Sequence, residues 1–127
     1  MSENPKWLTY EQVIAFHSRQ LRRFGGAPGL RDEGLLRSAL ERPVNKWQYE
    51  QADLAILAAA YAFGLAKNHP FIDGNKRIGF ATGILFLELN GYVFTASEVD
   101  AVLKTLALAA SAITENDYAK WLEKSCA

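Results

Sequence analysis

Cysteine is nearly absent from this sequence, and so is any long uninterrupted hydrophobic run. The single cysteine, Cys126, stands beside the C-terminus and has no partner for an intramolecular disulfide, which favours a reducing compartment. The hydrophobic stretch at 78–94 is interrupted by Glu88 and Asn90, which argues against a membrane-spanning helix. The first residues lack the basic start and apolar run of a secretion signal. We therefore expect a soluble, cytoplasmic protein.

An excess of charge of either sign is also missing. The 127 residues include 14 basic and 14 acidic side chains, a balance that argues against broad nucleic-acid binding. The composition, 50% hydrophobic and 22% charged, is that of a globular protein, and the length predicts one domain spanning 1–127. Four arginines lie close together in the sequence, and a solvated helix face explains them better than a basic patch: Arg19, Arg22, Arg23 and Arg31.

Several widespread catalytic motifs do not occur. The sequence contains no G-x-x-x-x-G-K-[ST], no G-x-G-x-x-G, no H-E-x-x-H and no C-x-x-C. Two histidines and one terminal cysteine are too few ligands for a zinc site. One of these histidines, His17, lies on the apolar face of a predicted helix, and we interpret it as a buried structural residue.

Apolar residues recur at helical spacing in six segments, and only residues 92–95 resemble a strand. Residues 52–67 and 75–89 are rich in Ala, Leu, Ile and Phe, which predicts two buried central helices. We therefore predict an all-α fold, a compact bundle of about six helices with a loop between the two central ones. Residues that typically cap helices precede five of the segments: Thr9, Asp32, Asp53, Ser97 and Thr114.

Pro43 is predicted to end the second helix, because proline removes a backbone donor and clashes with the preceding turn. Residues 44–51 would then be extended, so that Trp47 and Tyr49, two positions apart, project to the same side. Such a segment can act as a flap that contacts a partner. The alternative is that Trp47 only covers the core.

The most reactive stretch of the chain is His-Pro-Phe-Ile-Asp-Gly-Asn-Lys-Arg at 69–77. Its last three residues begin the second central helix, where free N–H groups and the helix dipole favour an anion such as phosphate. His69 precedes Pro70, which predicts an extended backbone that places the imidazole across the loop as a proton acceptor. Proton transfer beside a bound phosphate indicates phosphoryl or nucleotidyl transfer.

The other side chains of this stretch suit the same chemistry. Phe71 is expected to anchor the loop in the core. Asp73, the only carboxylate of the loop, is a candidate Mg²⁺ ligand or a cap of the next helix. Glycine allows close backbone approach, the asparagine amide can bind either the loop or a phosphate, and the cations match phosphate charge. The candidate phosphate-binding residues are Gly74, Asn75, Lys76 and Arg77.

Residues 69–77 resemble the signature of the Fic/Doc superfamily, which reads H-P-F-x-[DE]-G-N-G-R in its wider Fic form. Lys76 stands in place of the second motif glycine, as in the death-on-curing (Doc) branch of toxin–antitoxin toxins. Residues 29–43 and 64–70 are also similar to Doc-type sequences. The resemblance therefore extends over nearly the whole chain.

This resemblance implies a mostly helical fold and a reaction that uses ATP with Mg²⁺ as donor and a protein hydroxyl as acceptor. It implies that His69 is the general base, that Asp73 binds Mg²⁺, and that residues 74–77 hold the phosphates. In the Doc branch a phosphoryl group is transferred to a threonine of elongation factor Tu, whereas typical Fic enzymes transfer AMP. Lys76 favours phosphoryl transfer, because it adds charge to the floor of the anion site. AMP transfer and a non-enzymatic nucleotide- or antitoxin-binding module are the alternatives.

The resemblance also implies two kinds of protein partner. Fic-like proteins hold their target as an added strand in the region of 44–51, which makes Trp47 and Tyr49 candidate docking residues. A cognate antitoxin is expected to place a helical segment in an apolar groove and so inhibit the protein.

Residues 111–116 fit the self-inhibitory pattern [ST]-x-x-x-E-[GN] of Fic proteins, with Glu115 as the inhibitor. The arginine that such a glutamate engages is missing, because its position is taken by Phe80. Thr114 and Glu115 are also fully explained as the start of a helix, and we favour that interpretation.

Overall fold

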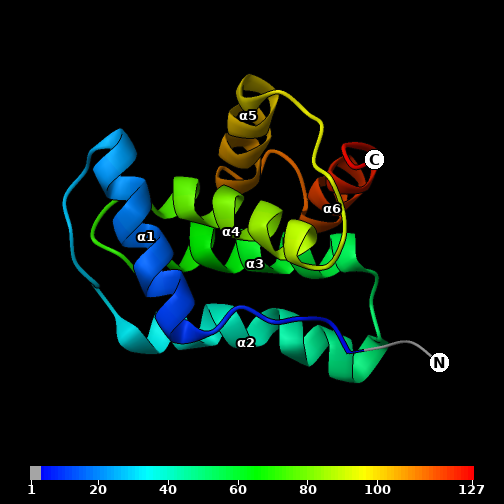
Figure 1. Cartoon of the computed structure of the whole chain (residues 1–127), viewed down its shortest axis with the longest axis horizontal. Helices are drawn as coiled ribbons and strands as arrows, with labels where there is room; N and C mark the ends of the chain where they lie inside the picture. Colours follow the sequence, from blue (N-terminus) through cyan, green and yellow to red (C-terminus); the bar gives the residue numbers. More distant parts are fainter. Residues whose placement is uncertain (1–3) are drawn as a thin grey trace.

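The computed structural model describes residues 4–127 and folds them into six α-helices without a β-sheet (Figure 1). The predicted all-α bundle is confirmed. No helix in this part of the chain has the length and apolar character needed to cross a membrane. The helices are α1 Tyr10–Phe24, α2 Glu33–Glu50, α3 Leu54–Asn68, α4 Asn75–Leu89, α5 Glu98–Ala109 and α6 Glu115–Lys124.

The antiparallel helices α3 and α4 form the centre of the bundle (Figure 1). α2 packs along α3, α1 lies against α4, and α5 and α6 cover the remaining side. Because α3 meets other helices on nearly every side, it is buried along most of its length, which accounts for its apolar composition.

Glycines on α4 allow the two central helices to approach closely. A Cβ atom added at Gly79 would lie 2.9 Å from the carbonyl oxygen of Ala62, and one added at Gly83 would lie 3.0 Å from that of Ala58. At such separations the backbone of α3 would have to move. The contact between α3 and α4 therefore depends on two glycines that lie one turn apart.

The N-cap residues predicted from the sequence make the expected hydrogen bonds at most helix starts. Asp53 occupies the N-cap position of α3, but its side chain makes no capping hydrogen bond. The other four predicted side chains each accept a backbone hydrogen bond from the first turn of their helix. These are Thr9, Asp32, Ser97 and Thr114.

The prediction that Pro43 ends the second helix is wrong. α2 continues to Glu50 and ends at Gln51, which has a left-handed backbone with φ 48°. Proline removes only its own donor and crowds the carbonyl four residues earlier, here that of Ala39. Both Pro43 and Ala39 are buried, so the packing of α2 on α3 outweighs this local cost. Residues 44–50 are therefore helical and not extended.

Residues 92–95 do not form a strand of a sheet. Phe94 makes an isolated antiparallel bridge with Cys126, and the N–H of Ala127 donates to the carbonyl of Val93 over 2.8 Å. This short pairing attaches the C-terminal residues to the connection between α4 and α5.

We expect Gly79→Ala to lower the free energy of unfolding by about 1–3 kcal/mol, because the added methyl group would push the backbone of α3 away from α4. Urea unfolding followed by circular dichroism measures the change. Gly34→Ala is the matched control, since Gly34 is an exposed helical glycine whose added Cβ would meet only a side-chain oxygen of Asp32, at 3.3 Å. Wild-type stability of Gly79→Ala would contradict the close packing described above.

Candidate active site

The loop between α3 and α4 lies at the same end of the bundle as the connection between α1 and α2 (Figure 1). The two segments are paired through their backbones. Leu30 and Phe71 form an isolated antiparallel bridge, and the N–H of Ile72 donates to the carbonyl of Gly29 over 3.0 Å. Residues 69–77 are therefore supported by a second segment of the chain.

Phe71 forms the buried side of this loop and is 2% exposed. Its ring stacks on that of His17, with centroids 3.7 Å apart and an angle of 8° between the planes. Nε2 of His17 lies 2.8 Å from the carbonyl oxygen of Asp73; a carbonyl can only accept, so Nε2 donates. His17 thus supports the loop from within the core, as interpreted from the sequence, and Phe71 lies in the anchoring position expected of it.

The side chain of Asn75 is bound to the loop. Its Oδ1 accepts from the N–H of Phe71 and its Nδ2 donates to the carbonyl of Phe71, both over 2.9 Å. The residue is buried, with 6% of its surface exposed. Of the two roles open to this amide, the structure shows the loop contact; the phosphate contact of Asn75, through its main-chain N–H or the second hydrogen of Nδ2, stays a prediction.

Asp73 is exposed, and its carboxylate accepts two backbone hydrogen bonds. The N–H of Ala27 donates to Oδ2 over 3.0 Å, and that of Gly74 donates to Oδ1 over 2.8 Å. These bonds, that of Ala27 first, lower the pKa of the Asp73 carboxyl, so the group is ionised at neutral pH. Asp73 does not cap α4, because Gly74 is the N-cap residue and no side-chain capping bond is made there.

This carboxylate fits a magnesium ion. Among residues 4–127, no group of three or more His, Cys, Asp or Glu side chains is arranged to hold a metal. Mg²⁺ is commonly held by one or two carboxylates together with substrate phosphates and water, so a single protein ligand is sufficient. Each oxygen of Asp73 keeps a lone pair after its backbone hydrogen bond. The donor set therefore suits Mg²⁺ bound together with a nucleotide and does not suit zinc.

His69 does not have the extended backbone predicted for it. It follows the last residue of α3 and adopts a left-handed conformation with φ 49° and ψ 54°. Pro70 disfavours continuation of the helix, and the chain turns sharply instead of extending. The residue is exposed, with Nδ1 3.4 Å from Nδ2 of Asn75. This contact is longer than an ordinary hydrogen bond, so Nδ1 of His69 is not held firmly by Asn75.

The N-terminus of α4 combines free backbone donors with two cations. The first helical hydrogen bond runs from the N–H of Ile78 to the carbonyl of Gly74 over 2.9 Å, which leaves the earlier N–H groups without helical partners. Gly74 has φ 77°, a conformation that glycine adopts without strain. Lys76 and Arg77 are exposed and add charge at the positive end of the helix dipole. These groups form an electropositive helix start suited to a phosphate.

An apolar groove of about 640 Å³ lies between α1, α4 and α5, and Lys76 and Arg77 contribute to its wall. The guanidinium of Arg77 stands over the ring of Phe24, 3.9 Å from its centroid. We call this the α1–α4–α5 groove. Its apolar lining includes Phe16, Phe24, Phe80, Leu85, Val102 and Leu106.

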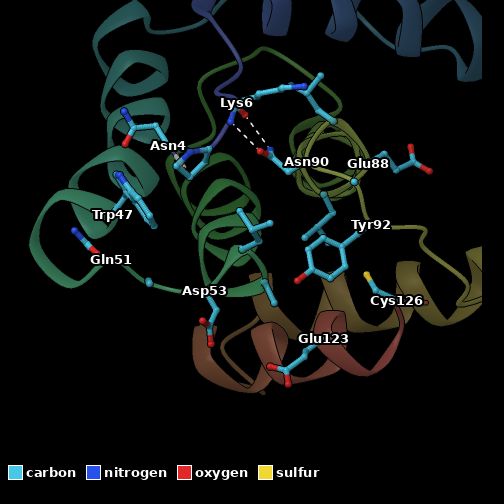
Figure 2. A pocket seen from close by; sticks show the side chains of 17 residues that line it. Asn4, Lys6, Trp47, Gln51, Asp53, Glu88, Asn90, Tyr92, Glu123 and Cys126 are labelled. Carbon is cyan, nitrogen blue, oxygen red and sulfur yellow. Dashed lines mark hydrogen bonds between the residues drawn. The ribbon is translucent and has the colours of Figure 1, made fainter. Parts of the chain in front are cut away.

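Trp47 and Tyr49 do not share a face of the molecule. Two positions along a helix correspond to a rotation of about 200°, whereas residues two positions apart lie on the same side only in a strand. Tyr49 is 86% exposed and lines a cavity of about 380 Å³ beside α3, together with Asn68. Trp47 lines a different cavity, of about 860 Å³, between the ends of α2 and α4 and the start of α3 (Figure 2).

The cavity in Figure 2 lies at the far end of α3 from the loop. Asp53 and Leu54 at the start of this helix contribute to its wall, whereas His69 follows the last residue of the helix. The 15 residues of α3 span about 22 Å. The predicted joint docking role of Trp47 and Tyr49 therefore loses its structural basis, because α2 continues as a helix and turns the two side chains apart.

Glu115 forms ion pairs with side chains of α2. It pairs with Arg42, and its Oε2 lies 3.7 Å from Nζ of Lys46. Its position as the first residue of α6, after the N-cap Thr114, agrees with the interpretation of this segment as a helix start. These ion pairs connect the start of α6 to α2 through side chains.

The chain is similar to known proteins over the part that carries this site. The model of the Fic/DOC family matches residues 7–87, which include α1 to α3 and most of α4. Protein kinase doc of Escherichia phage P1 is 36% identical over 91 residues, which cover 70% of this chain and 72% of the relative. Toxin Doc of Mycolicibacterium smegmatis (strain ATCC 700084 / mc(2)155) is 41% identical over 75 residues, 58% of each chain. The resemblance seen in the sequence is confirmed.

Asn75→Asp tests the clamp on Phe71. The aspartate can still accept from the N–H of Phe71, but it places an oxygen against the Phe71 carbonyl where Nδ2 now donates. We expect the free energy of unfolding to fall by about 1–3 kcal/mol, because a buried carbonyl loses its partner. Urea unfolding at neutral pH measures this, with Asn45→Asp on the exposed face of α2 as the control. A loss in Asn75→Asp no larger than in the control would show that the clamp contributes little.

Proposed function

Because the chain belongs to the Fic/DOC family, we propose that it is a Doc-type toxin that transfers a phosphoryl group from ATP to a serine or threonine hydroxyl of a protein. The observation that carries the proposal is the bend between α3 and α4. There, an exposed imidazole, an ionised carboxylate and an electropositive helix start lie within residues 69–77. The relative named protein kinase doc supports phosphoryl transfer, and the relative named toxin Doc supports a toxin.

In this proposal the phosphates of ATP bind at the N-terminus of α4. The main-chain N–H groups of the first turn, together with Lys76 and Arg77, neutralise the phosphate charge. Asp73 holds Mg²⁺, which when bound supplies further neutralisation of the phosphates. Gly74 has no Cβ, so the backbone can follow the phosphates closely.

His69 acts as the general base. An unprotonated nitrogen of its imidazole takes the proton of the acceptor hydroxyl as the hydroxyl oxygen attacks the γ-phosphorus. The bond between the γ-phosphorus and the β–γ bridging oxygen breaks, and ADP leaves with that electron pair. Because such a transition state is loose, positioning and charge neutralisation supply most of the rate.

Two features favour phosphoryl transfer over AMP transfer. Lys76 places a long cation beside the anion site, where glycine would leave room, so the phosphate chain has to lie differently. Phe80, three residues after Arg77, packs against the edge of Phe94 with ring centroids 6.1 Å apart, and a second phosphate-binding arginine is therefore missing from this face of α4. One alternative is an enzyme that transfers AMP. The other is a non-enzymatic protein that binds a nucleotide or an antitoxin.

The α1–α4–α5 groove is the proposed binding site for a helix of the cognate antitoxin. It presents an apolar surface, and Val102 and Leu106 of α5 are each 46% exposed. An amphipathic helix would bury these side chains. Since Lys76 and Arg77 also line this groove, a bound helix would interfere with the phosphate site, which accounts for inhibition. Elongation factor Tu is the proposed target, from the family resemblance. The cytoplasm is the proposed location, in keeping with the single cysteine of the sequence.

We expect His69→Ala to abolish phosphoryl transfer while ATP binding and thermal stability stay close to those of the wild type. The imidazole is exposed and contributes little to the core, so its loss removes the base and not the fold. Intact-mass spectrometry of elongation factor Tu after incubation with ATP and Mg²⁺ measures the reaction and separates an added phosphate from an added AMP. Lys120→Ala, an exposed change on α6, is the control.

Wild-type transfer by His69→Ala would exclude this histidine as the base. Addition of AMP by the wild-type protein would select the alternative activity. ATP binding without modification of any tested protein would favour the non-enzymatic module.

Leu106→Glu is expected to weaken antitoxin binding by at least about tenfold, because it places a charge in the apolar groove. Leu103→Glu is a matched control, since Leu103 is exposed on α5 but does not line the groove. Isothermal titration calorimetry with the product of an adjacent small open reading frame measures the dissociation constants. Equal weakening by both substitutions would place the antitoxin elsewhere on α5.

A further inference from the structure

The backbone of His69 has a conformation that needs support from its surroundings. Its φ of 49° is positive, and the next residue is Pro70. Non-glycine residues rarely occupy the left-handed region, and they stay there only when neighbouring contacts hold them. His69 also ends α3, whose last carbonyl groups have no N–H partners within the helix.

Arg31 supplies two of these missing partners. Its Nε donates to the carbonyl oxygen of His69 over 2.6 Å, and its Nη2 donates to that of Asn68 over 2.9 Å. The two carbonyls flank the Cα atom of His69, so a planar guanidinium that binds both restricts φ and ψ of this residue together.

The backbone of Arg31 is itself fixed by contacts with the loop. The main-chain N–H of Arg31 donates to the carbonyl of Pro70 over 2.7 Å, and the preceding residue, Leu30, forms the bridge with Phe71. Arg31 takes part in none of the ion pairs formed within residues 4–127, so its charge is directed to the two carbonyls. The prediction that Arg31 belongs to a solvated helix face is therefore wrong, because it lies in the connection between α1 and α2.

We propose that Arg31 is a positioning residue: by holding the backbone of His69 it sets the direction in which the imidazole projects. This inference rests on the proposed function, in which His69 is the general base. The direction of the Cα–Cβ bond follows from the backbone, so release of the two carbonyls would let the ring move relative to the start of α4. Arg31 contacts the end of α3 and not Lys76 or Arg77, so it affects the rate of transfer and not the binding of ATP.

The kinetic test uses the full chain with Arg31→Met and Arg31→Lys. Methionine removes the donors at similar length, whereas lysine keeps the charge without the planar fork. We expect kcat for phosphoryl transfer to fall roughly 10- to 100-fold in Arg31→Met and less in Arg31→Lys, with KM for ATP within about twofold of the wild type.

The matched control is Arg37→Met. Arg37 is an exposed arginine of α2 whose guanidinium lies 3.8 Å from the carboxylate of Glu33 and 4.1 Å from the ring centroid of Tyr10, two residues outside 69–77. We expect wild-type kcat and KM in this variant. A loss of kcat as large as that in Arg31→Met would overturn the proposal, because any exposed arginine would then have the same effect.

A second measurement does not depend on activity. A positive φ brings the amide and α protons of a residue close together, so wild-type His69 should show a strong intraresidue nuclear Overhauser effect. We expect this effect to weaken in Arg31→Met and to be unchanged in Arg37→Met. If the wild-type protein transfers no phosphoryl group, the proposed function fails, and this measurement alone decides whether Arg31 holds His69.

Wild-type kcat in Arg31→Met, or an unchanged Overhauser effect at His69 in that variant, would overturn the proposal. If Arg31→Met does not fold, Arg31→Lys carries both measurements. A lowered kcat in Arg31→Lys at an unchanged melting temperature supports positioning, and wild-type kcat in that variant contradicts it.

Discussion

The attachment of Phe71 to the core is the interaction on which the reactive end of this molecule depends. Its ring stacks on the buried ring of His17, and its peptide N–H and carbonyl are both bound by the side chain of Asn75. His69 precedes Phe71 by two residues and Asp73 follows it by two. Fixing one buried side chain and its backbone therefore limits where both reactive groups can lie, and leaves them exposed to a ligand.

Support and chemistry are divided between different residues of the same short loop. The buried members make hydrogen bonds and stacking contacts within the protein, whereas the exposed members, His69, Asp73, Lys76 and Arg77, have capacity left for phosphate, metal or hydroxyl. Preorganisation of this kind lowers the cost of arranging charges during a reaction. Arg31 extends the same support to the end of α3 from outside the loop.

The course of α2 shows how tertiary packing can outweigh a strong local signal. Pro43 is a sound reason to expect a helix end, yet the buried contact of this part of α2 with α3 keeps the helix intact. The change from strand to helix then separates Trp47 from Tyr49, because the two periods place residues two positions apart on different sides. The binding surface predicted for Trp47 and Tyr49 depended on an extended segment, and it is lost because the segment is helical.

The sequence by itself determined the helix count, most helix starts and the family, because apolar spacing, capping side chains and the 69–77 signature are local patterns. It also indicated His17 as structural, from its place on an apolar face. Only the tertiary structure decided that Asn75 clamps the loop and that Arg31 reaches the carbonyls of residues 68 and 69. Each of these roles depends on which partner the tertiary fold brings close. An amide or guanidinium can donate equally well to a phosphate or to a backbone carbonyl, so the sequence alone does not determine the partner.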